Sequence, residues 1–372
     1  MRKHRDTLPA AKSKDELLKL VHKSQVVLVQ GETGCGKTTQ VGQFLIEACE
    51  GARVVVTQPR RVAAVSVAQR VAEERGERLG RGAVGYSVRG ETQIDREACR
   101  LLFCTNGILL RRLLGESDDM FSDRTCTHLV IDEVHERSVE IDLLLTLLSH
   151  CLAERPGLRV LLMSATMDVE QLAKMFPTRP PILKIPGRTF PVSQLYLEDA
   201  EDTLGMFTKF PGGGDEPEEA AAPAPEARGG RPQRFLAPLD FGMLSKLVVA
   251  AVNGGLKDGP RDGAILVFVP GVGEISRLIS ELSRAETGGQ RLLPLPLHGA
   301  LPPDQQRRCF EVPPKGGPRK VVVSTNVAET SVTVPDVTIV IDTGRERRLC
   351  LDPGAVAPCL AERHCAQSSL RQ

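Results

Sequence analysis

A glycine-rich stretch, GETGCGKTT at residues 31–39, has the residue types and spacing of a phosphate-binding loop. The fixed positions of the pattern G-x-x-x-x-G-K-[ST] are filled by Gly31, Gly36, Lys37 and Thr38. Glycines let such a loop curl so that its backbone N–H groups face phosphate oxygens, and a following helix adds partial positive charge. Lys37 would then reach the β- and γ-phosphates of a nucleotide, and the Thr38 hydroxyl would ligate Mg²⁺.

The segments on either side of this loop support the same interpretation. An apolar run, VVLV at 26–29, indicates a strand before the loop, and residues 39–49 have a helix-like pattern after it. A strand, a loop and a helix in this order are the context that a P-loop requires. The alternative is a glycine-rich turn that matches the pattern by chance.

An acidic pair, Asp132-Glu133, follows another apolar run, LVI at 129–131. Asp132 would hold Mg²⁺ through water, and Glu133 would orient and deprotonate the attacking water. The alternative is a solvated acidic turn before a helix. Because the pair would share one sheet with the P-loop, the two motifs together favour a site that hydrolyses a nucleoside triphosphate.

Strands and helices alternate through the first half of the chain, which is how these motifs would be brought together. Apolar strands that end in polar residues are typical of a parallel α/β sheet with ligands at the carboxyl ends of its strands. The expected strands lie at 26–29, 53–57, 101–104, 128–131 and 159–163, and the expected helices at 13–24, 39–49, 63–76, after 107 to about 114, and 140–152. In the first helix, Leu17, Leu20 and Val21 share one face. Ser13 is predicted to be its N-cap, in a capping box with Glu16.

The composition changes over residues 197–236, which are rich in Gly, Pro, Ala and Glu and lack apolar periodicity. This is typical of a disordered low-complexity insertion, with a functional acidic tail as the alternative. The α/β alternation then resumes and predicts a second domain of similar design, without a P-loop of its own. Its expected strands lie at 264–269, 293–297, 320–324 and, as the final strand, 337–341; its expected helices lie at 239–252, 274–284 and 303–310.

Composition and charge exclude several classes of protein. The 372 residues are 41% hydrophobic and 26% charged, which is ordinary for two globular domains. No apolar run reaches the roughly 18 residues of a membrane span, and the first residues lack the apolar block of a secretory signal. Ten cysteines without a C-x-x-C pair are typical of reduced thiols, buried in strands or helices at Cys49, Cys104 and Cys151. We therefore expect an intracellular protein, in the nucleus or the cytoplasm, that binds no membrane.

The net charge of +1 gives the chain no global basic field, and aromatic residues make up only 3% of it. Stacking platforms for bases are therefore scarce. A nucleic acid, if one is bound, would be held mainly through its sugar–phosphate backbone.

The sequence resembles the DEAH/RHA group of superfamily 2 helicases, whose motifs it contains in order. GETGCGKTT resembles motif I, and DEVHERS at 132–138 resembles motif II in the DEVH spelling. TQPRRVAA at 57–64, TNG at 105–107 and SAT at 164–166 are similar to motifs Ia, Ib and III. LVFVPG at 266–271 looks like motif IV, and STNVAETSVTVP at 324–335 closely resembles motif V.

This resemblance implies two RecA-like domains with parallel sheets, with ATP and Mg²⁺ bound between them and single-stranded RNA crossing both. The implied organisation is an N-terminal extension at 1–12, a first domain at 13–196, the insertion at 197–236 and an incomplete second domain at 237–372.

The resemblance also implies roles for individual residues at the nucleotide. Thr33, Gly34 and Thr39 join the P-loop set, and His135 joins the catalytic residues of motif II. Ser164 and Thr166 would couple hydrolysis to movement of the strand. Arg70 and Phe310 would sandwich the adenine, a clamp that accepts several NTPs because stacking reads no hydrogen-bonding edge. Thr330 would approach the phosphates from the second domain.

The residues that the resemblance assigns to RNA lie in motifs Ia, Ib and V and in a hook-like loop. They are Arg60, Arg61, Arg89, Thr105, Asn106, Thr325 and Asn326. Taken one at a time, these residues also fit simpler interpretations. Arg60 and Arg61 could begin a solvated helix, Asn106 could lie in an ordinary turn, and Phe310 could be a core residue.

The chain departs from the family pattern at three positions and at its end. Cys35 replaces the usual Ser of the P-loop, where its side chain need not face phosphate. Asn106 replaces an Asp of motif Ib, and Gly90 stands where Phe is common in the hook. The sequence stops at Gln372, where motif VI and its arginines would begin, so we expect nucleotide binding with poor hydrolysis.

These observations predict an ATP-dependent RNA helicase or RNP remodeller, and the resemblance implies that it moves 3′ to 5′ along single-stranded RNA. We expect it to be a monomer, with an activator protein as a further partner, and to serve in RNA processing. One alternative is a hydrolysis-deficient, nucleotide-dependent RNA-binding fragment or scaffold. A weaker one is a DNA helicase of the same superfamily.

Overall fold

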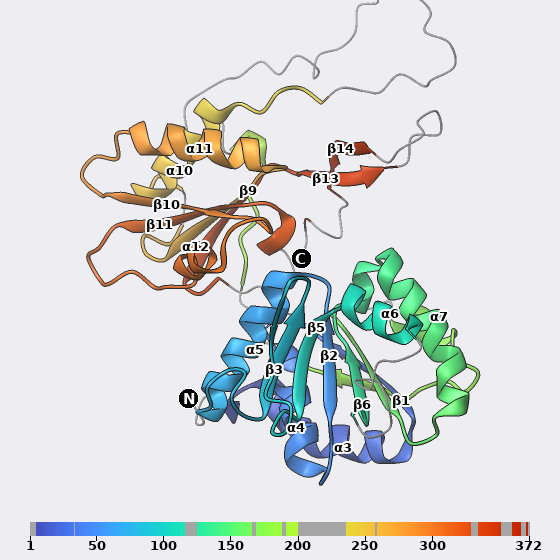
Figure 1. The fold of residues 1–372 in the computed structure, drawn as a ribbon. Coiled ribbons are helices and arrows are strands. Elements are labelled where there is room, and N and C mark those ends of the chain that lie inside the picture. The colour runs from blue at the N-terminus through green and yellow to red at the C-terminus, as the bar shows by residue number, and fades with distance from the viewer. Residues whose placement is uncertain are drawn as a thin grey trace, which may run out of the picture. The chain divides into compact units, whose positions relative to one another are not determined.

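The computed structural model describes residues 5–32, 34–115, 125–165, 169–187, 191–199, 236–256, 259–328, 334–350, 359–365 and 370. The chain divides into two compact units, of which the first comprises residues 1–191 with 330–333 and the second residues 192–329 with 334–372. Each unit contains its own parallel sheet (Figure 1). Most of the predicted insertion, residues 200–235, lies outside the described residues.

The first unit is built on an eight-stranded sheet with the order β4-β3-β5-β2-β6-β7-β1-β8. Neighbouring strands are parallel except in the β3–β4 hairpin. The strands are β1 Val26–Gly31, β2 Val54–Gln58, β3 Val84–Val88, β4 Glu91–Gln93, β5 Leu101–Thr105, β6 His128–Ile131, β7 Arg159–Ser164 and β8 Ile182–Ile185. Because β7 lies between β1 and β6, the segments that follow these three strands meet at one edge of the sheet.

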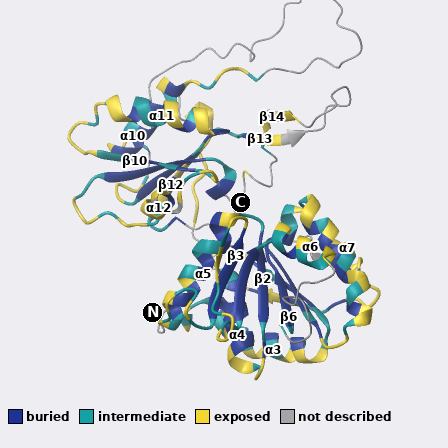
Figure 2. Cartoon of the chain, viewed as in Figure 1, coloured by how far each residue is buried: buried dark blue, intermediate teal, exposed yellow. Residues whose placement is uncertain are grey.

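Helices cover both faces of this sheet because its strands bury side chains on both sides. In β1, Val27 and Val29 belong to the core beneath α3, α4 and α5, whereas Leu28 belongs to the core beneath α6 and α7. The central strands of the sheet are accordingly coloured as buried in Figure 2. The helical segments are α2 Pro9–Lys12, α3 Lys14–Lys23, α4 Lys37–Ala48, α5 Arg61–Arg75, α6 Asn106–Leu114, η2 Val134–Glu136, α7 Val139–Glu154 and α8 Val169–Ala173.

The second unit has a smaller parallel sheet with the order β10-β11-β9-β12. One face packs against α10 and α11, and the other packs against the segments around α12 and η3. A separate antiparallel pair, β13 and β14, follows the sheet along the chain. The elements are α10 Phe241–Val252, β9 Ala264–Phe268, α11 Val272–Arg284, β10 Leu292–Leu297, α12 Pro303–Arg308, β11 Arg319–Ser324, η3 Asn326–Ala328, β12 Val337–Asp342, β13 Arg345–Cys350 and β14 Cys359–His364.

The structure confirms the two α/β domains with parallel sheets, and it corrects several details. The segment 337–341 is not the final strand, because β13 and β14 follow it. Strands β3, β4 and β8 were not predicted. The capping box at Ser13 does not form, since Ser13 ends α2 by donating its N–H to Ala10 and its side chain makes no cap bond.

Burial of the thiols is only partly as predicted. Cys104 is buried, whereas Cys49 and Cys151 are half-buried, and all the described cysteines are free. Among the described residues, no helix is both long and apolar enough to cross a membrane.

Candidate nucleotide-binding site and nucleic-acid contacts

The P-loop connects the end of β1 to the start of α4. Gly34 and Gly36 have φ angles of 80° and 92°, in the left-handed region that side chains disfavour. Lys37 begins α4 and is only 4% exposed. Thr33 lies outside the described residues. The glycines therefore serve the backbone path that the sequence pattern predicted, and they place Lys37 and Thr38 at the N-terminus of a helix.

At two positions of the loop, a side chain would meet a close neighbour. A Cβ atom at Gly31 would lie 2.8 Å from Sγ of Cys35, whose side chain is buried in the hydrophobic core. This is consistent with the prediction that Cys35 need not face phosphate. A Cβ atom at Gly36 would lie 3.0 Å from Cδ1 of Leu8. The backbone N–H of Ala10 also donates to the carbonyl of Cys35 at 2.9 Å, so residues 8–10 pack directly on the loop.

Asp132 is fully buried at the end of β6 and is held by three hydrogen-bond donors. Its Oδ2 accepts from Oγ1 of Thr38 at 2.7 Å and from Nε2 of Gln58 at 2.8 Å. Its Oδ1 accepts from the backbone N–H of Glu133 at 2.9 Å. Residues that lie far apart in the sequence are thus in contact, and Gln58 is a member of the site that sequence reasoning missed.

Glu133 is 4% exposed and has a left-handed backbone, with φ of 54° and ψ of 38°. Burial and the charge of Asp132 raise its pKa to about 8, against an opposing effect of Lys37. Its Oε2 has no hydrogen-bond partner among the described residues. A strained backbone and a shifted pKa at one acidic residue are typical of a functional site.

His135 lies beside this acidic pair, and Ser164 ends β7, the strand next to β6. Nδ1 of His135 is 3.5 Å from Oε2 of Glu133 and accepts from the backbone N–H of Ala165 at 3.4 Å. Burial lowers the pKa of His135, which favours the neutral ring that such an acceptor requires. Ser164 is buried at the end of β7, while Thr166 lies outside the described residues. The segment after β6 and the segment after β7 are therefore joined by a hydrogen bond.

These residues fit a nucleotide with Mg²⁺. Magnesium is usually bound by one or two protein oxygens together with substrate phosphates. Thr38 and Asp132 supply a hydroxyl and a carboxylate in contact, next to a loop whose backbone is suited to phosphate. The unpartnered buried oxygens of Gln58 and Glu133 leave acceptors open there. Among the described residues, no group of three or more His, Cys, Asp or Glu could hold a metal ion.

The two residues predicted to clamp the base lie in different units. Arg70 is on α5, with a side chain 44% exposed and its Nε bonded to Oε1 of Glu74 at 2.8 Å. Phe310 follows α12 and packs, half-buried, against the core of the second unit. Their pairing around a base stays a prediction, and Thr330 lies outside the described residues.

The candidate RNA contacts of the first unit differ in exposure. Arg61 and Arg89 are exposed, Arg89 at the turn of the β3–β4 hairpin. Arg60 is half-buried and lies 3.5 Å from Glu136 in an ion pair. Thr105 is half-buried, whereas Asn106 is buried at the start of α6. Neither polar atom of the Asn106 side chain has a hydrogen-bond partner among the described residues.

In the second unit, Thr325 and Asn326 follow β11 and are half-buried. The backbone N–H of Thr325 donates to the carbonyl of Leu297 at 3.2 Å. Asn326 begins η3. Both side chains therefore lie at the carboxyl end of a central strand, where parallel sheets bind ligands.

Two family models match the chain, the DEAD/DEAH box helicase over residues 12–175 and the helicase conserved C-terminal domain over residues 245–352. The chain belongs to the DEAD/DEAH-box helicases. The first match contains the P-loop and the acidic pair, and the second contains the central sheet of the second unit.

Relatives of this helicase family align with nearly the whole chain. A DExH-box ATP-dependent RNA helicase of Arabidopsis thaliana is 38% identical over 407 residues, which are 99% of this chain and 33% of the relative. A second one from the same plant is 36% identical over 398 residues, 99% of this chain and 39% of the relative. An ATP-dependent DNA/RNA helicase of Bos taurus is 38% identical over 385 residues, 95% of this chain and 38% of the relative. The chain thus spans about two fifths or less of the length of these helicases.

Proposed function

We propose that this chain is the motor of an ATP-dependent RNA helicase, which couples hydrolysis of a nucleoside triphosphate to movement along single-stranded RNA. The observation that carries the proposal is the contact between Thr38 and Asp132 at 2.7 Å, beside the buried carboxyl group of Glu133. It joins the P-loop to the acidic pair, as a nucleotide-hydrolysing site requires.

Each residue of the site has a task that follows from its surroundings. The backbone of the P-loop and Lys37 would bind the phosphates, and Thr38 and Asp132 would hold Mg²⁺. Bound Mg²⁺ would supply positive charge that stabilises the phosphoryl group during transfer. Glu133 would orient a water molecule and accept its proton at Oε2, the oxygen that accepts no hydrogen bond from the described residues. The hydrogen bond from Ala165 to His135 would link this step to the segment after β7.

RNA would be held through its backbone. Arg60, Arg61 and Arg89 can each contact phosphate from the first unit. Thr325 and Asn326 would do so from the second.

The sequence adds further properties to the proposal. They are movement in the 3′ to 5′ direction, remodelling of RNPs, a monomeric state, an activator protein as a partner and an intracellular location. Strand displacement on duplexes with a 3′ or a 5′ overhang tests the direction.

The proposal predicts that single-stranded RNA raises the rate of ATP hydrolysis by the purified chain above its rate without RNA, however low that basal rate is. Lys37→Ala should abolish the stimulated rate because it removes the charge that holds the phosphates. Glu140→Gln is a matched control, since Glu140 is an exposed acid at the start of α7. A steady-state ATPase assay with and without RNA checks this, and no stimulation of the wild-type chain would contradict it.

The same assay separates the alternatives. Binding of ATP and RNA without turnover would support a nucleotide-dependent RNA-binding module in place of a helicase. A relative named as a DNA/RNA helicase makes single-stranded DNA the necessary comparison. Equal or stronger stimulation by DNA of the same sequence would overturn the preference for RNA.

A further inference from the structure

Glu74 is a buried acid of α5 that no step above uses. It is 4% exposed, and its Oε1 accepts from Nε of Arg70 at 2.8 Å. Its Oε2 accepts from Nε2 of Gln40 at 2.8 Å and from Nε2 of Gln43 at 3.0 Å, both on the P-loop helix α4. Burying a carboxylate is unfavourable unless donors surround it, and here α4 supplies two of them.

We infer that Glu74 is a positioning residue, which fixes the guanidinium group of Arg70 relative to the phosphate-binding loop. This inference rests on the proposed function, since it takes Arg70 to be the residue that holds the nucleotide base. The side chain of Arg70 is 44% exposed, and its Nε is held by the hydrogen bond to the buried Glu74. Long exposed side chains lose much rotamer freedom on binding, so an anchored Arg70 would bind a base at a lower entropic cost.

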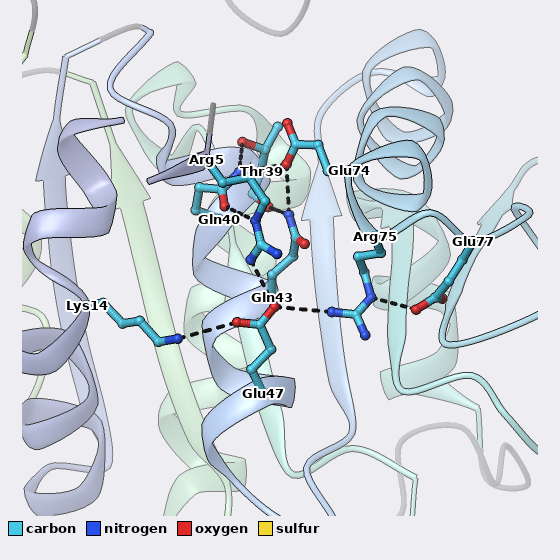
Figure 3. Close-up of polar contacts among 9 residues, drawn as sticks. All are labelled: Arg5, Lys14, Thr39, Gln40, Gln43, Glu47, Glu74, Arg75 and Glu77. Atoms are coloured by element: carbon cyan, nitrogen blue, oxygen red, sulfur yellow. Dashed lines mark hydrogen bonds and ion pairs between the residues drawn. The ribbon is translucent and has the colours of Figure 1, made fainter. Parts of the chain in front are cut away.

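Glu74 is also bonded to the P-loop helix and, through Gln40, to Arg5 of the N-terminal segment, as Figure 3 shows. Gln40 is fully buried, and its Nε2 also donates to Oγ1 of Thr39 at 3.0 Å. Its Oε1 accepts from Nε of Arg5 at 2.9 Å, which fixes the orientation of the amide that donates to Glu74. Arg5 is itself paired with Glu47 of α4 at 2.9 Å. Side-chain hydrogen bonds therefore run from Arg5 through Gln40 and Glu74 to Arg70.

The test compares a ligand that has a base with one that has none. Glu74→Gln keeps the shape of the side chain but removes its charge and one acceptor. Calorimetric titration in Mg²⁺ with ADP and with pyrophosphate should show about tenfold weaker binding of ADP and a change within about twofold for pyrophosphate. Glu73→Gln is the matched control, because Glu73 is the exposed neighbour on the same helix and should bind both ligands as the wild type does.

A double-mutant cycle identifies the route of the effect. Arg70→Ala should weaken the binding of ADP. Adding Glu74→Gln to this variant should weaken ADP binding no further, because Glu74 acts through Arg70. Arg5→Gln should weaken the binding of ADP about threefold more than the binding of pyrophosphate. This variant replaces Glu74→Gln in the test if Glu74→Gln does not fold.

The outcomes are distinguishable from failure of the proposed function. If Glu74→Gln lost the same affinity for ADP as for pyrophosphate, Glu74 would have a merely structural role and the inference would be overturned. So would unchanged ADP binding, or additive effects with Arg70→Ala. Failure of the wild-type chain to bind ADP would instead overturn the proposed function.

Discussion

Three buried carboxylates of the first unit differ in their hydrogen-bond donors. Asp132 and Glu74 each have three donors, which hold them in one orientation. Oε2 of Glu133 accepts no hydrogen bond from the described residues, and burial and the charge of Asp132 raise the pKa of Glu133 to about 8. A carboxylate that is fixed by hydrogen-bond donors is suited to holding a ligand or another side chain in place. A carboxyl group with an open oxygen and a shifted pKa is suited to the exchange of a proton. The roles proposed for these three residues follow this difference.

A buried histidine in β6 predicts a pH dependence of stability. Burial lowers the pKa of His128 from 6.5 to about 4. Below pH 6.5 the unfolded chain therefore binds a proton that the folded chain does not, so stability falls as pH decreases toward 4. His128→Asn should remove about 2 kcal/mol of the loss in unfolding free energy between pH 7.5 and pH 5.

Urea unfolding at the two pH values measures this difference. His150→Asn serves as the control, because His150 is exposed on α7. The same pH dependence in the wild type and His128→Asn would contradict the prediction.

Only part of the site could be predicted at the residue scale. Lys37, Thr38 and Asp132 belong to motifs with a fixed spacing, and the structure brings Thr38 and Asp132 into contact. Gln58 lies in the stretch similar to motif Ia and Glu74 lies outside the motifs, and neither contact could be predicted because their partners depend on strand order and on which helices are neighbours. One signal was available for Gln58, which ends an apolar strand as Asp132 does. Glu74 has the i, i+4 spacing from Arg70, which could have indicated the pair.

At the scale of elements, the P-loop depends on the N-terminal segment as well as on its own strand and helix. Gly36 and Gly34 both have positive φ, but a Cβ atom added at Gly36 would meet Leu8, whereas one added at Gly34 would have no neighbour within 4 Å. Gly36→Ala should therefore lower the unfolding free energy by about 3 kcal/mol, from backbone strain and the contact together. Gly34→Ala should lower it by about 1 to 2 kcal/mol, from strain alone.

The double variant Leu8→Ala with Gly36→Ala tests the contact, because removing the leucine should restore about 1 kcal/mol relative to additive effects. Urea unfolding of the wild type, the two single variants and the double variant measures this coupling. Strict additivity would show that residues 8–10 do not support the loop.

Two of the strands that were missed, β4 and β13, share a physical reason. The strand β4 is the polar sequence ETQ, and β13 begins RERR, so neither has the apolar alternation that predicts a strand. They form because a hairpin partner supplies their hydrogen bonds. The central strands, in contrast, are buried on both faces and read as continuous apolar runs.

At the scale of the whole molecule, each unit has its own hydrophobic core and should lose stability separately. The second unit buries Lys320, which is 1% exposed. Its Nζ donates to the carbonyls of Cys309 and Glu311 at 3.1 Å and 2.8 Å and pairs with Asp336 at 2.6 Å. Lys320→Met leaves these acceptors without a donor, and it should destabilise the second unit by about 3 to 4 kcal/mol.

Hydrogen exchange followed by mass spectrometry separates the two units. Protection should fall in β9–β12 and persist in β1, β6 and β7. Lys315→Met is the control, because Lys315 is exposed. Loss of protection in both sheets would show that the units unfold together.

The central claim is that Thr38 and Asp132 bind the nucleotide with Mg²⁺ while Glu133 carries out the proton transfer. Measuring ATP binding and RNA-stimulated hydrolysis in the same Glu133→Gln protein tests it most directly. We predict ATP affinity within about threefold of the wild type and a rate at least about 10²-fold lower, because a general base is lost while the binding groups remain. Hydrolysis by Glu133→Gln at a rate near that of the wild type would contradict the account.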